Sequence, residues 1–181
     1  MKGIVFTEFA ELVEGTFGED MMDTLIENTN PPSEGAYTAV GSYDFEELAA
    51  MVTELSRLTN IEASKLLYVF GEHLAKTFTS KFAQFFVEAG SATKFLKHVD
   101  DHVHVEVKKL YPDAETPAFD FREDPQTGIV TMVYESRRPL ADVAHGLIVG
   151  VCSYYDEQFN ISREDWYVED VYCCRFTLEA A

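Results

Sequence analysis

Basic residues and long apolar runs are both scarce in this sequence. Its 181 residues contain 14 Lys and Arg against 32 Asp and Glu, which gives a formal net charge of −18 at pH 7. Such an acidic surface repels phosphate backbones and anionic lipid headgroups, so we expect neither nucleic acid nor a membrane surface as a partner. No apolar run approaches the roughly 20 residues that a membrane span requires.

Cysteines are few as well, and they form no disulfide framework. The three are Cys152, Cys173 and Cys174, and the adjacent pair would face opposite sides of a strand. The sequence contains no CxxC pair and no convincing set of zinc-ligand spacings. The N-terminal stretch MKGIVFTEFAELVEG also lacks the uninterrupted apolar segment of a signal peptide. These features are typical of a reducing compartment, so we expect a cytoplasmic protein.

Apolar residues are plentiful: they make up 46% of the chain, and 13% of it is aromatic. This composition predicts one globular domain with a sizeable core. In the first half of the chain the apolar positions recur at helical spacing. Helices are predicted over 5–17 with Gly18 as the stop, over 21–26, from Asp44 to Leu58, over 64–78 with Asn60 as its cap, and over 92–110 after Ser91. Gly71, in the middle of one of these helices, indicates a close approach by another element.

From Ala118 the pattern changes to that of strands. FDFRE and GIVTMVYES, joined by the turn DPQTG, predict two paired strands. The stretch PLADVAHGLIVGVCSYYDEQF predicts a late helix, and FNIS, WYVED and VYCCRFTLE predict three final strands. The fold class is therefore α+β. We expect a helical N-terminal lobe over 1–60, followed over 61–181 by a lobe with a small antiparallel sheet crossed by one helix.

The stretch YESRR at 134–138 ends the second of these strands. Side chains alternate faces along a strand, so Tyr134, Ser136 and Arg138 project to one side. Two hydroxyls and a guanidinium suit an anion with several oxygens, such as paired carboxylates or a phosphate. The alternative is a solvated strand end with a capping serine and a surface arginine. The pentapeptide alone does not choose between them.

Three histidines lie on the helix predicted over 92–110. His102 and His104 flank its apolar stripe, and His98 lies further toward solvent. The two flanking side chains point about 200° apart, so they cannot chelate one metal ion together. Each is compatible with simple amphipathic filling of the core edge. Either is also compatible with a single axial bond to haem iron, which needs only one protein nitrogen. Periodicity does not choose between them.

Taken together, four stretches resemble the haem–nitric oxide/oxygen binding (H-NOX) family, bacterial sensors related to the haem domain of soluble guanylate cyclase. MKGIVFTEFAELVEGTFG resembles the first helix of the family, and FGEHLAKTF its helix on the distal side of the haem. HVHVEVKKLYPDAETPAF resembles the segment that carries the haem-ligating histidine. YESRR matches the Tyr-x-Ser-x-Arg motif of the family. The order and spacing hold over essentially the whole chain, which implies an α+β fold enclosing haem b.

The resemblance also implies roles for individual residues. Tyr134, Ser136 and Arg138 would hold the two haem propionates, and His104, seven residues before Tyr111 of the Tyr-Pro pair, would ligate the iron. Pro117 matches the proline that presses the haem out of planarity. The residues expected on the distal side share apolar side chains without an O–H group: Val5, Phe9, Leu74, Phe78, Val143 and Leu147. Ordinary core packing is a second explanation for these six.

Gas preference follows by the same resemblance. Oxygen-binding members carry a tyrosine where Val143 falls here, so the distal set resembles the pockets that select NO over O2. CO is a second candidate ligand. His145, two residues further along the helix, is expected at the surface. Several members also carry a structural zinc site; Ala141 and Trp166 fall where its cysteines would stand and only Cys174 keeps a ligand type, so we expect no zinc.

The resemblance therefore implies a non-catalytic, monomeric gas sensor. Its signal would pass to a separate histidine kinase or cyclic-di-GMP enzyme by release or shift of the helix that carries His104. Two alternatives belong to other classes. A haem peroxidase would need a distal acid–base group such as His beside Arg, and the expected pocket offers none. A haem-free module would use Tyr134, Ser136 and Arg138 to bind an acidic small molecule.

Overall fold

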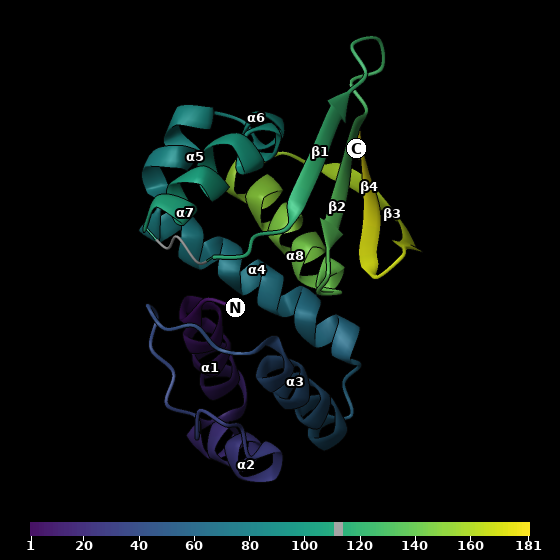
Figure 1. Ribbon diagram of the computed structural model, residues 1–181. Coiled ribbons are helices and arrows are strands. Elements are labelled where there is room, and N and C mark those ends of the chain that lie inside the picture. The colour runs from purple at the N-terminus through teal and green to yellow at the C-terminus, as the bar shows by residue number, and fades with distance from the viewer. Residues whose placement is uncertain (111–113) are drawn as a thin grey trace.

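Three helices form one end of the molecule in the computed structural model, which describes residues 1–110 and 114–181 (Figure 1). They are α1 (Gly3–Phe17), α2 (Glu19–Thr29) and α3 (Phe45–Thr59). Gly18 separates the first two with φ +93°, a conformation that L side chains rarely adopt, so it ends α1 as predicted. The second helix is longer than the predicted 21–26, because acidic residues continue it at both ends.

Two expected helix caps are wrong. Asp44 does precede α3, but its side chain makes no capping hydrogen bond. Glu47, its predicted capping-box partner, is buried and accepts hydrogen bonds from Ser33 and Tyr37 instead. Asn60 ends α3 in the left-handed conformation, with φ 56°, and the residue preceding the next helix is Glu62. Tertiary contacts thus override the local capping pattern.

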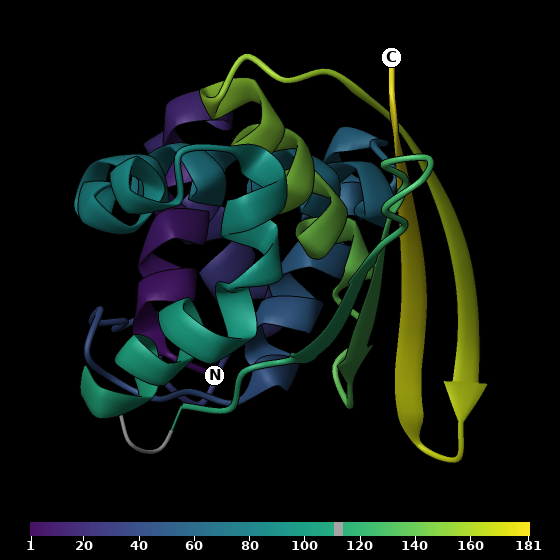
Figure 2. The ribbon, with the colours of Figure 1, turned by 90° about the horizontal axis from the view of Figure 1, so that it is seen from above.

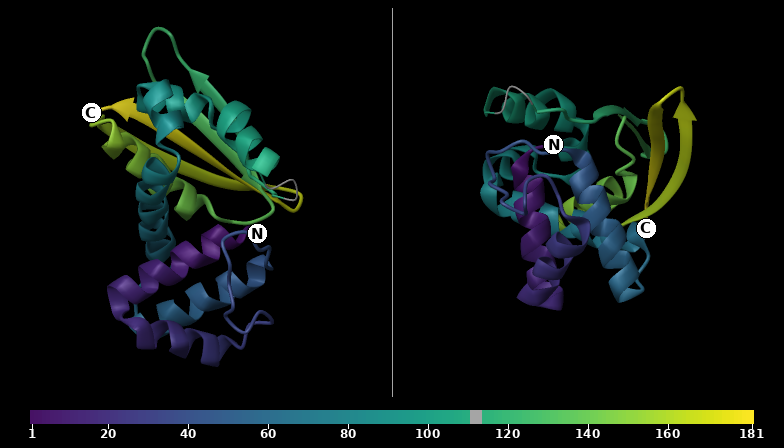
Figure 3. Two further views of the ribbon diagram at one scale, coloured as in Figure 1. Left: turned by 90° about the vertical axis from the view of Figure 1, so that its left-hand side faces the viewer. Right: turned by 60° about the horizontal axis from the view of Figure 1, so that its bottom comes forward.

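The long helix α4 (Ala63–Lys81) packs on α1 and α3, two of these front helices, and α8 (Ala141–Tyr154) packs along it (Figures 1 and 3). The two backbones nearly touch where glycines meet. A Cβ placed at Gly71 would lie 2.2 Å from the carbonyl oxygen of Val143, and one at Gly146 would lie 2.0 Å from that of Tyr68. The prediction that Gly71 permits a close approach is confirmed.

The single helix predicted over 92–110 is instead three segments. They are α6 (Ala92–Lys97), the π-helix η1 (Val99–His104) and α7 (Val105–Leu110), and another short helix, α5 (Ala83–Ala89), precedes them. Ser91 caps α6 as expected, because its hydroxyl accepts the backbone N–H of Lys94. The N–H of Val103 reaches back five residues to the carbonyl of His98, at 3.4 Å, which marks the wider π turn. Tyr111 and Pro112, the Tyr-Pro pair from which the family resemblance places His104, lie outside the described residues.

Four antiparallel strands form one sheet in the order β1-β2-β4-β3. Their bounds are β1 (Ala118–Glu123), β2 (Val130–Ser136), β3 (Phe159–Val168) and β4 (Val171–Ala180). FNIS and WYVED are one strand rather than two, because β3 pairs with β4 over its full length and an edge strand tolerates the polar residues between them. The helices lie against one face of the sheet (Figure 2). The α+β prediction is confirmed.

Two apolar clusters fill the interior. The sheet cluster lies between the sheet and the helices that cover it, and includes Phe95, Tyr134 and Phe176. The front cluster joins α1, α2 and α3 to α4 and to the start of α8, and includes Phe9 and Leu74. Phe78 packs against both clusters. In the described part of the chain, no helix is long and apolar enough to cross a membrane.

Candidate functional site

His104 is the last residue of η1, and only 15% of its side chain is exposed. Its Nδ1 lies 2.8 Å from one carboxylate oxygen of Asp100, and the other oxygen accepts the backbone N–H of Phe119 at 2.9 Å. An ionised carboxylate can only accept hydrogen bonds, so Nδ1 carries the proton. The opposite nitrogen, Nε2, then keeps its lone pair. A carboxylate holding Nδ1 in this way is the usual support of a metal-binding histidine.

Burial also favours the neutral form of this imidazole. Desolvation lowers the pKa of His104 below its ordinary value, although the hydrogen bond that its ring donates to Asp100 acts in the opposite direction. A neutral ring is the form that can bind a metal. His102 is exposed, and its ring lies 5.0 Å from that of His98. Burial and the hydrogen bond to Asp100 therefore favour His104 over His102 as the iron ligand. Periodicity alone did not decide between them.

The alternation predicted for YESRR is present in the structure. Tyr134 is buried and Arg138 is 22% exposed, whereas Glu135 and Arg137 point to solvent. The Tyr134 hydroxyl donates to the carbonyl of Arg138 at 2.8 Å, and the backbone N–H of Arg138 donates to the Ser136 hydroxyl at 3.0 Å. The two hydroxyls thus hold the turn that leads from β2 toward α8. The two alternatives predicted for this stretch are thus both present in part: Ser136 caps the turn, and Tyr134, Ser136 and Arg138 lie on the less exposed side.

The guanidinium of Arg138 engages an acid. It donates to the carboxylate of Glu115 and, at 3.5 Å, to the backbone carbonyl of the same residue. The Glu115 side chain is 78% exposed, so it can give way to another carboxylate at little cost. Both residues line a polar pocket of about 280 Å³, together with Met1, Lys2, Ser42, Tyr43 and Asp44.

Burial also raises the pKa of Tyr134, which keeps its hydroxyl proton available for donation.

Phe119 connects the histidine to the Tyr134 side of the site. It pairs with Tyr134 in the β1–β2 register, and the centroids of the two rings lie 5.7 Å apart. On its other side, its ring lies 5.8 Å from that of His104. Pro117, half-buried, precedes β1 two residues before Phe119. Phe119 thus lies between His104 and Tyr134, the first residue of the Tyr-x-Ser-x-Arg motif.

Sequence reasoning missed the three residues that organise this site: Asp100, Phe119 and Glu115. The four-residue spacing of Asp100 and His104 could have indicated their contact, because side chains at that spacing share a helix face. The other two contacts involve the strand β1 and the segment before it, and nothing local in the sequence indicates them.

The six residues expected on the distal side gather in the front cluster. Phe9, Leu74 and Val143 are among its buried members, and Val5, Phe78 and Leu147 pack against it. Tyr37 and Tyr43 also pack against this cluster, but their hydroxyls are engaged: that of Tyr37 donates to Glu47 at 3.0 Å, and that of Tyr43 to the carbonyl of Ala36 at 3.1 Å. The six residues expected on the gas-facing side are therefore all part of the front cluster or packed against it.

One prediction on α8 is wrong. His145 is not at the surface but half-buried, with its ring 5.1 Å from that of Tyr68 and 5.6 Å from that of Phe176. The helix α8 packs on α4 and also contributes Ala144, Ile148 and Val151 to the sheet cluster, so more than one of its faces is covered. Burial lowers the pKa of His145.

The donor set fits a haem. A neutral, carboxylate-supported imidazole suits the iron, and an arginine that already binds one carboxylate suits a propionate. The apolar front cluster suits the porphyrin face.

Comparison with known proteins points the same way. A family model described as Haem-NO-binding matches residues 2–163. The Fe(II) unliganded H-NOX protein from K. algicida is 31% identical, with a TM-score of 0.93 over 100% of this chain and 97% of that one. A mutant of that protein in the same state is 33% identical, with a TM-score of 0.92 and the same coverage. An H-NOX protein from S. oneidensis in the Fe(II)NO ligation state is 24% identical, with a TM-score of 0.91 over 100% of this chain and 99% of that one.

Proposed function

The chain belongs to the haem-NO-binding (H-NOX) family and is a haem-based gas sensor, and from this premise we propose that it binds NO at ferrous haem b in preference to O2. The relative from S. oneidensis is described in its Fe(II)NO ligation state, which supports NO as the ligand here. CO is a second candidate ligand. We propose sensing without catalysis, since none of the six expected distal residues carries an acid–base group for peroxidase chemistry.

The residues of this chain divide the task of holding the haem. A ferrous haem bound here would supply an iron that can bind a diatomic gas. His104 would hold the iron through Nε2, while Asp100 fixes the orientation of its ring. Tyr134, Ser136 and Arg138 would hold the propionates, with Arg138 exchanging Glu115 for a propionate. Pro117 would press on the porphyrin from the segment before β1.

The observation that carries the gas preference is the apolar character of the front cluster. O2 gains from a nearby hydroxyl donor, and NO does not require one. Val143 stands where a tyrosine would supply that donor, and the other five expected distal residues also lack one. The hydroxyls of Tyr37 and Tyr43 are already committed to other acceptors. None of the six expected distal residues therefore offers O2 a hydrogen bond that would offset the intrinsic preference of ferrous haem for NO.

The signal would arise from movement between the two lobes that we propose, 1–60 and 61–181. The π-helix η1 holds His104 through a wide turn, and relaxation of such a turn to ordinary α geometry shifts the residues that follow it. Release or shift of this segment would move the front helices relative to the rest, a two-state element biased by the ligand. A monomer in the cytoplasm would pass this change to a separate histidine kinase or cyclic-di-GMP enzyme.

Absorption spectroscopy tests the proposal directly. The purified protein should show a Soret band; a colourless protein with an intact fold would favour the haem-free, anion-binding alternative. In the ferrous state it should form a complex with NO and give no stable O2 complex in air. A stable O2 spectrum would contradict the argument from the apolar cluster.

Two substitutions at one position then isolate the hydroxyl. Val143→Tyr adds the donor found in O2-binding relatives, and Val143→Phe adds nearly the same volume without it. We expect the Tyr variant alone to gain O2 binding. Equal behaviour of the two variants toward O2 would show that a hydroxyl at this position does not decide the gas preference.

A further inference from the structure

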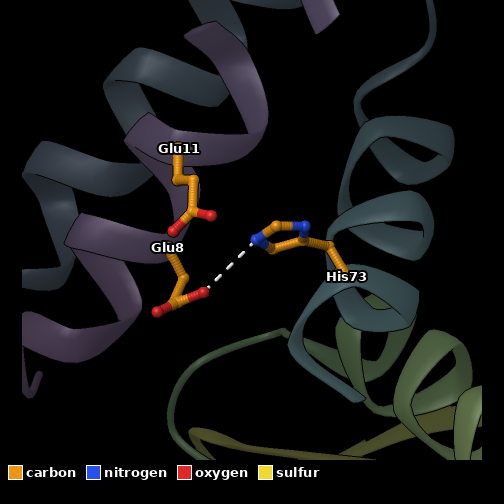
Figure 4. Close-up of side chains that lie close together, drawn as sticks. All are labelled: Glu8, Glu11 and His73. Carbon is orange, nitrogen blue, oxygen red and sulfur yellow. Dashed lines mark ion pairs between the residues drawn. The ribbon is translucent and has the colours of Figure 1, made fainter. Parts of the chain in front are cut away.

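A second group of metal-binding side chains lies between α1 and α4. Within the described residues, Glu8, Glu11 and His73 are the one group of three or more His, Cys, Asp or Glu whose ligand atoms all lie within 4.8 Å of one another. The two glutamates are three residues apart on α1, so they share a face of that helix. The histidine comes from α4 and points toward them (Figure 4).

His73 carries an unsatisfied nitrogen. Its Nε2 is buried and has no hydrogen-bond partner in the described structure, although it lies 3.3 Å from Oε2 of Glu8. Glu8 itself is only 3% exposed. This contact with Glu8 is an ion pair only when the ring is protonated (Figure 4). In the neutral ring the buried nitrogen makes no hydrogen bond, which is unfavourable, and a cation between it and the carboxylate oxygens would satisfy both.

We propose that Glu8, Glu11 and His73 bind a divalent transition-metal ion, with Zn²⁺ as the best fit. One imidazole nitrogen and two carboxylate oxygens are ligands that Zn²⁺ accepts, leaving its fourth position to water. Metal–ligand bonds of about 2.0–2.1 Å put the ligands of a tetrahedral ion about 3.3 Å apart. The distance from Nε2 of His73 to Oε2 of Glu8 is 3.3 Å, and Glu11 is exposed and able to move closer.

The other partners of Glu8 set the strength of this site. Thr77 donates to Oε2 at 2.7 Å, which supports a metal-bound carboxylate as hydrogen bonds around metal sites commonly do. Lys81 lies 2.6 Å from the other oxygen, Oε1, and its positive charge opposes the metal. Its side chain is 50% exposed, so solvent screens part of this charge. Glu8, Glu11 and Lys81 together still carry a net negative charge, which attracts a cation.

The site differs from the zinc site that resembling family members carry and that we do not expect in this chain. Its histidine lies 62 and 65 positions from the two glutamates, on another helix, and the group contains no cysteine. An ion bound there would join α1 to α4 in addition to the Lys81 contact. Phe9 and Leu74, the next residues after Glu8 and His73, belong to the front cluster. The metal would therefore hold together two helices that surround this cluster.

Calorimetric titration of the haem-loaded full chain with ZnCl2 tests the proposal, after treatment with a chelator. We expect one saturable site. Glu11→Gln and His73→Gln should each weaken zinc binding at least about tenfold, since each removes one of three ligands. Glu14→Gln and His98→Gln are matched controls, because they remove the same groups at positions outside the cluster, and they should leave the affinity unchanged. Circular dichroism and the Soret band confirm that each variant is folded.

Lys81→Gln should change the zinc affinity in the opposite direction. It removes the opposing charge, so zinc should bind more tightly and raise the Tm more than it does in the wild type. Absence of saturable binding, or equal binding by the wild type, Glu11→Gln and His73→Gln, would overturn the proposal. Neither outcome bears on the proposed gas sensing, because none of these substitutions alters a residue assigned to the haem.

Discussion

Gly71 of α4 lies against the backbone of Val143 of α8. A Cβ at Gly71 would lie 2.2 Å from the carbonyl oxygen of Val143 and 2.9 Å from the Cα of Gly146. No real side chain fits at these distances, so the missing Cβ sets the spacing of the two helices. Both helices contribute to the front cluster, through Leu74 and Val143, and their close packing therefore fixes one wall of the expected gas-binding side.

Replacing Gly71 by alanine should destabilise the protein despite the better helix propensity of alanine. The added methyl group forces the two backbones apart, at a cost of about 1–3 kcal/mol. Urea unfolding measures the change. Gly15→Ala is the matched control: it lies within α1 and a Cβ there would meet nothing within 4 Å. It should stabilise the protein by up to about 1 kcal/mol. Equal effects of the two substitutions would show that the α4–α8 contact yields without cost.

His104→Gly should abolish stable haem binding, because it removes the nitrogen that we assign to the iron. Added imidazole should restore binding by filling the space left by the side chain. The Soret band, measured with and without imidazole, reports both effects. His102→Gly is the matched control, since His102 is exposed two residues away. Loss of haem from the His102 variant and its retention by the His104 variant would show that the ligand is His102.

Asp100→Asn tests the support of His104 rather than the ligand itself. The amide cannot accept both the imidazole N–H and the N–H of Phe119 as strongly as the carboxylate does. Removal of such a partner typically weakens metal binding about 10–100-fold, so haem should dissociate faster by a similar factor. Transfer of haem to apomyoglobin measures the rate. Asp101→Asn, at the exposed neighbouring position, should leave it unchanged. Equal rates for both variants would contradict the role of Asp100.

The elements that could be predicted from sequence are those with a strong local pattern. Gly18 and Ser91 set the end of α1 and the start of α6 as expected, and the alternation in YESRR placed Tyr134 inward. Gly71 indicated a close approach because a glycine within a helix lowers its stability, and close packing against another element can offset that loss. The order of helices and strands then followed, and with it the α+β class.

The features that could not be predicted depend on contacts between distant segments. The π turn before His104 differs from an α-helix by one hydrogen-bond step, to which apolar periodicity is insensitive. Strand β3 continues through Ser162 and Glu164 because β4 satisfies the hydrogen-bonding groups of its backbone. The cluster of Glu8 and His73 forms between helices 65 positions apart in the chain. None of these relationships leaves a local signal.

Acid should loosen the attachment of β3 to the rest of the sheet and to α8, through Asp165. Burial raises the pKa of this carboxyl, but hydrogen bonds from Tyr172 at 2.5 Å and Arg163 at 2.9 Å outweigh it, so the net pKa lies below its ordinary value. Arg163 also pairs with Asp142 near the start of α8. A lowered pKa in the folded state means that the ionised form stabilises the fold above the pKa of the unfolded chain, about 3.9.

This stability is lost as the pH falls through the folded value. Because the Asp165 side chain is 41% exposed, we expect the contribution to be about 1 kcal/mol or less. Urea unfolding between about pH 6 and pH 2.5 should therefore show a smaller acid-induced decline for Asp165→Asn than for the wild type. Asp170→Asn, in the exposed turn of the same hairpin, should keep the wild-type decline. If both variants show the wild-type decline in unfolding free energy, the charge of Asp165 does not contribute to the stability of the network around Arg163.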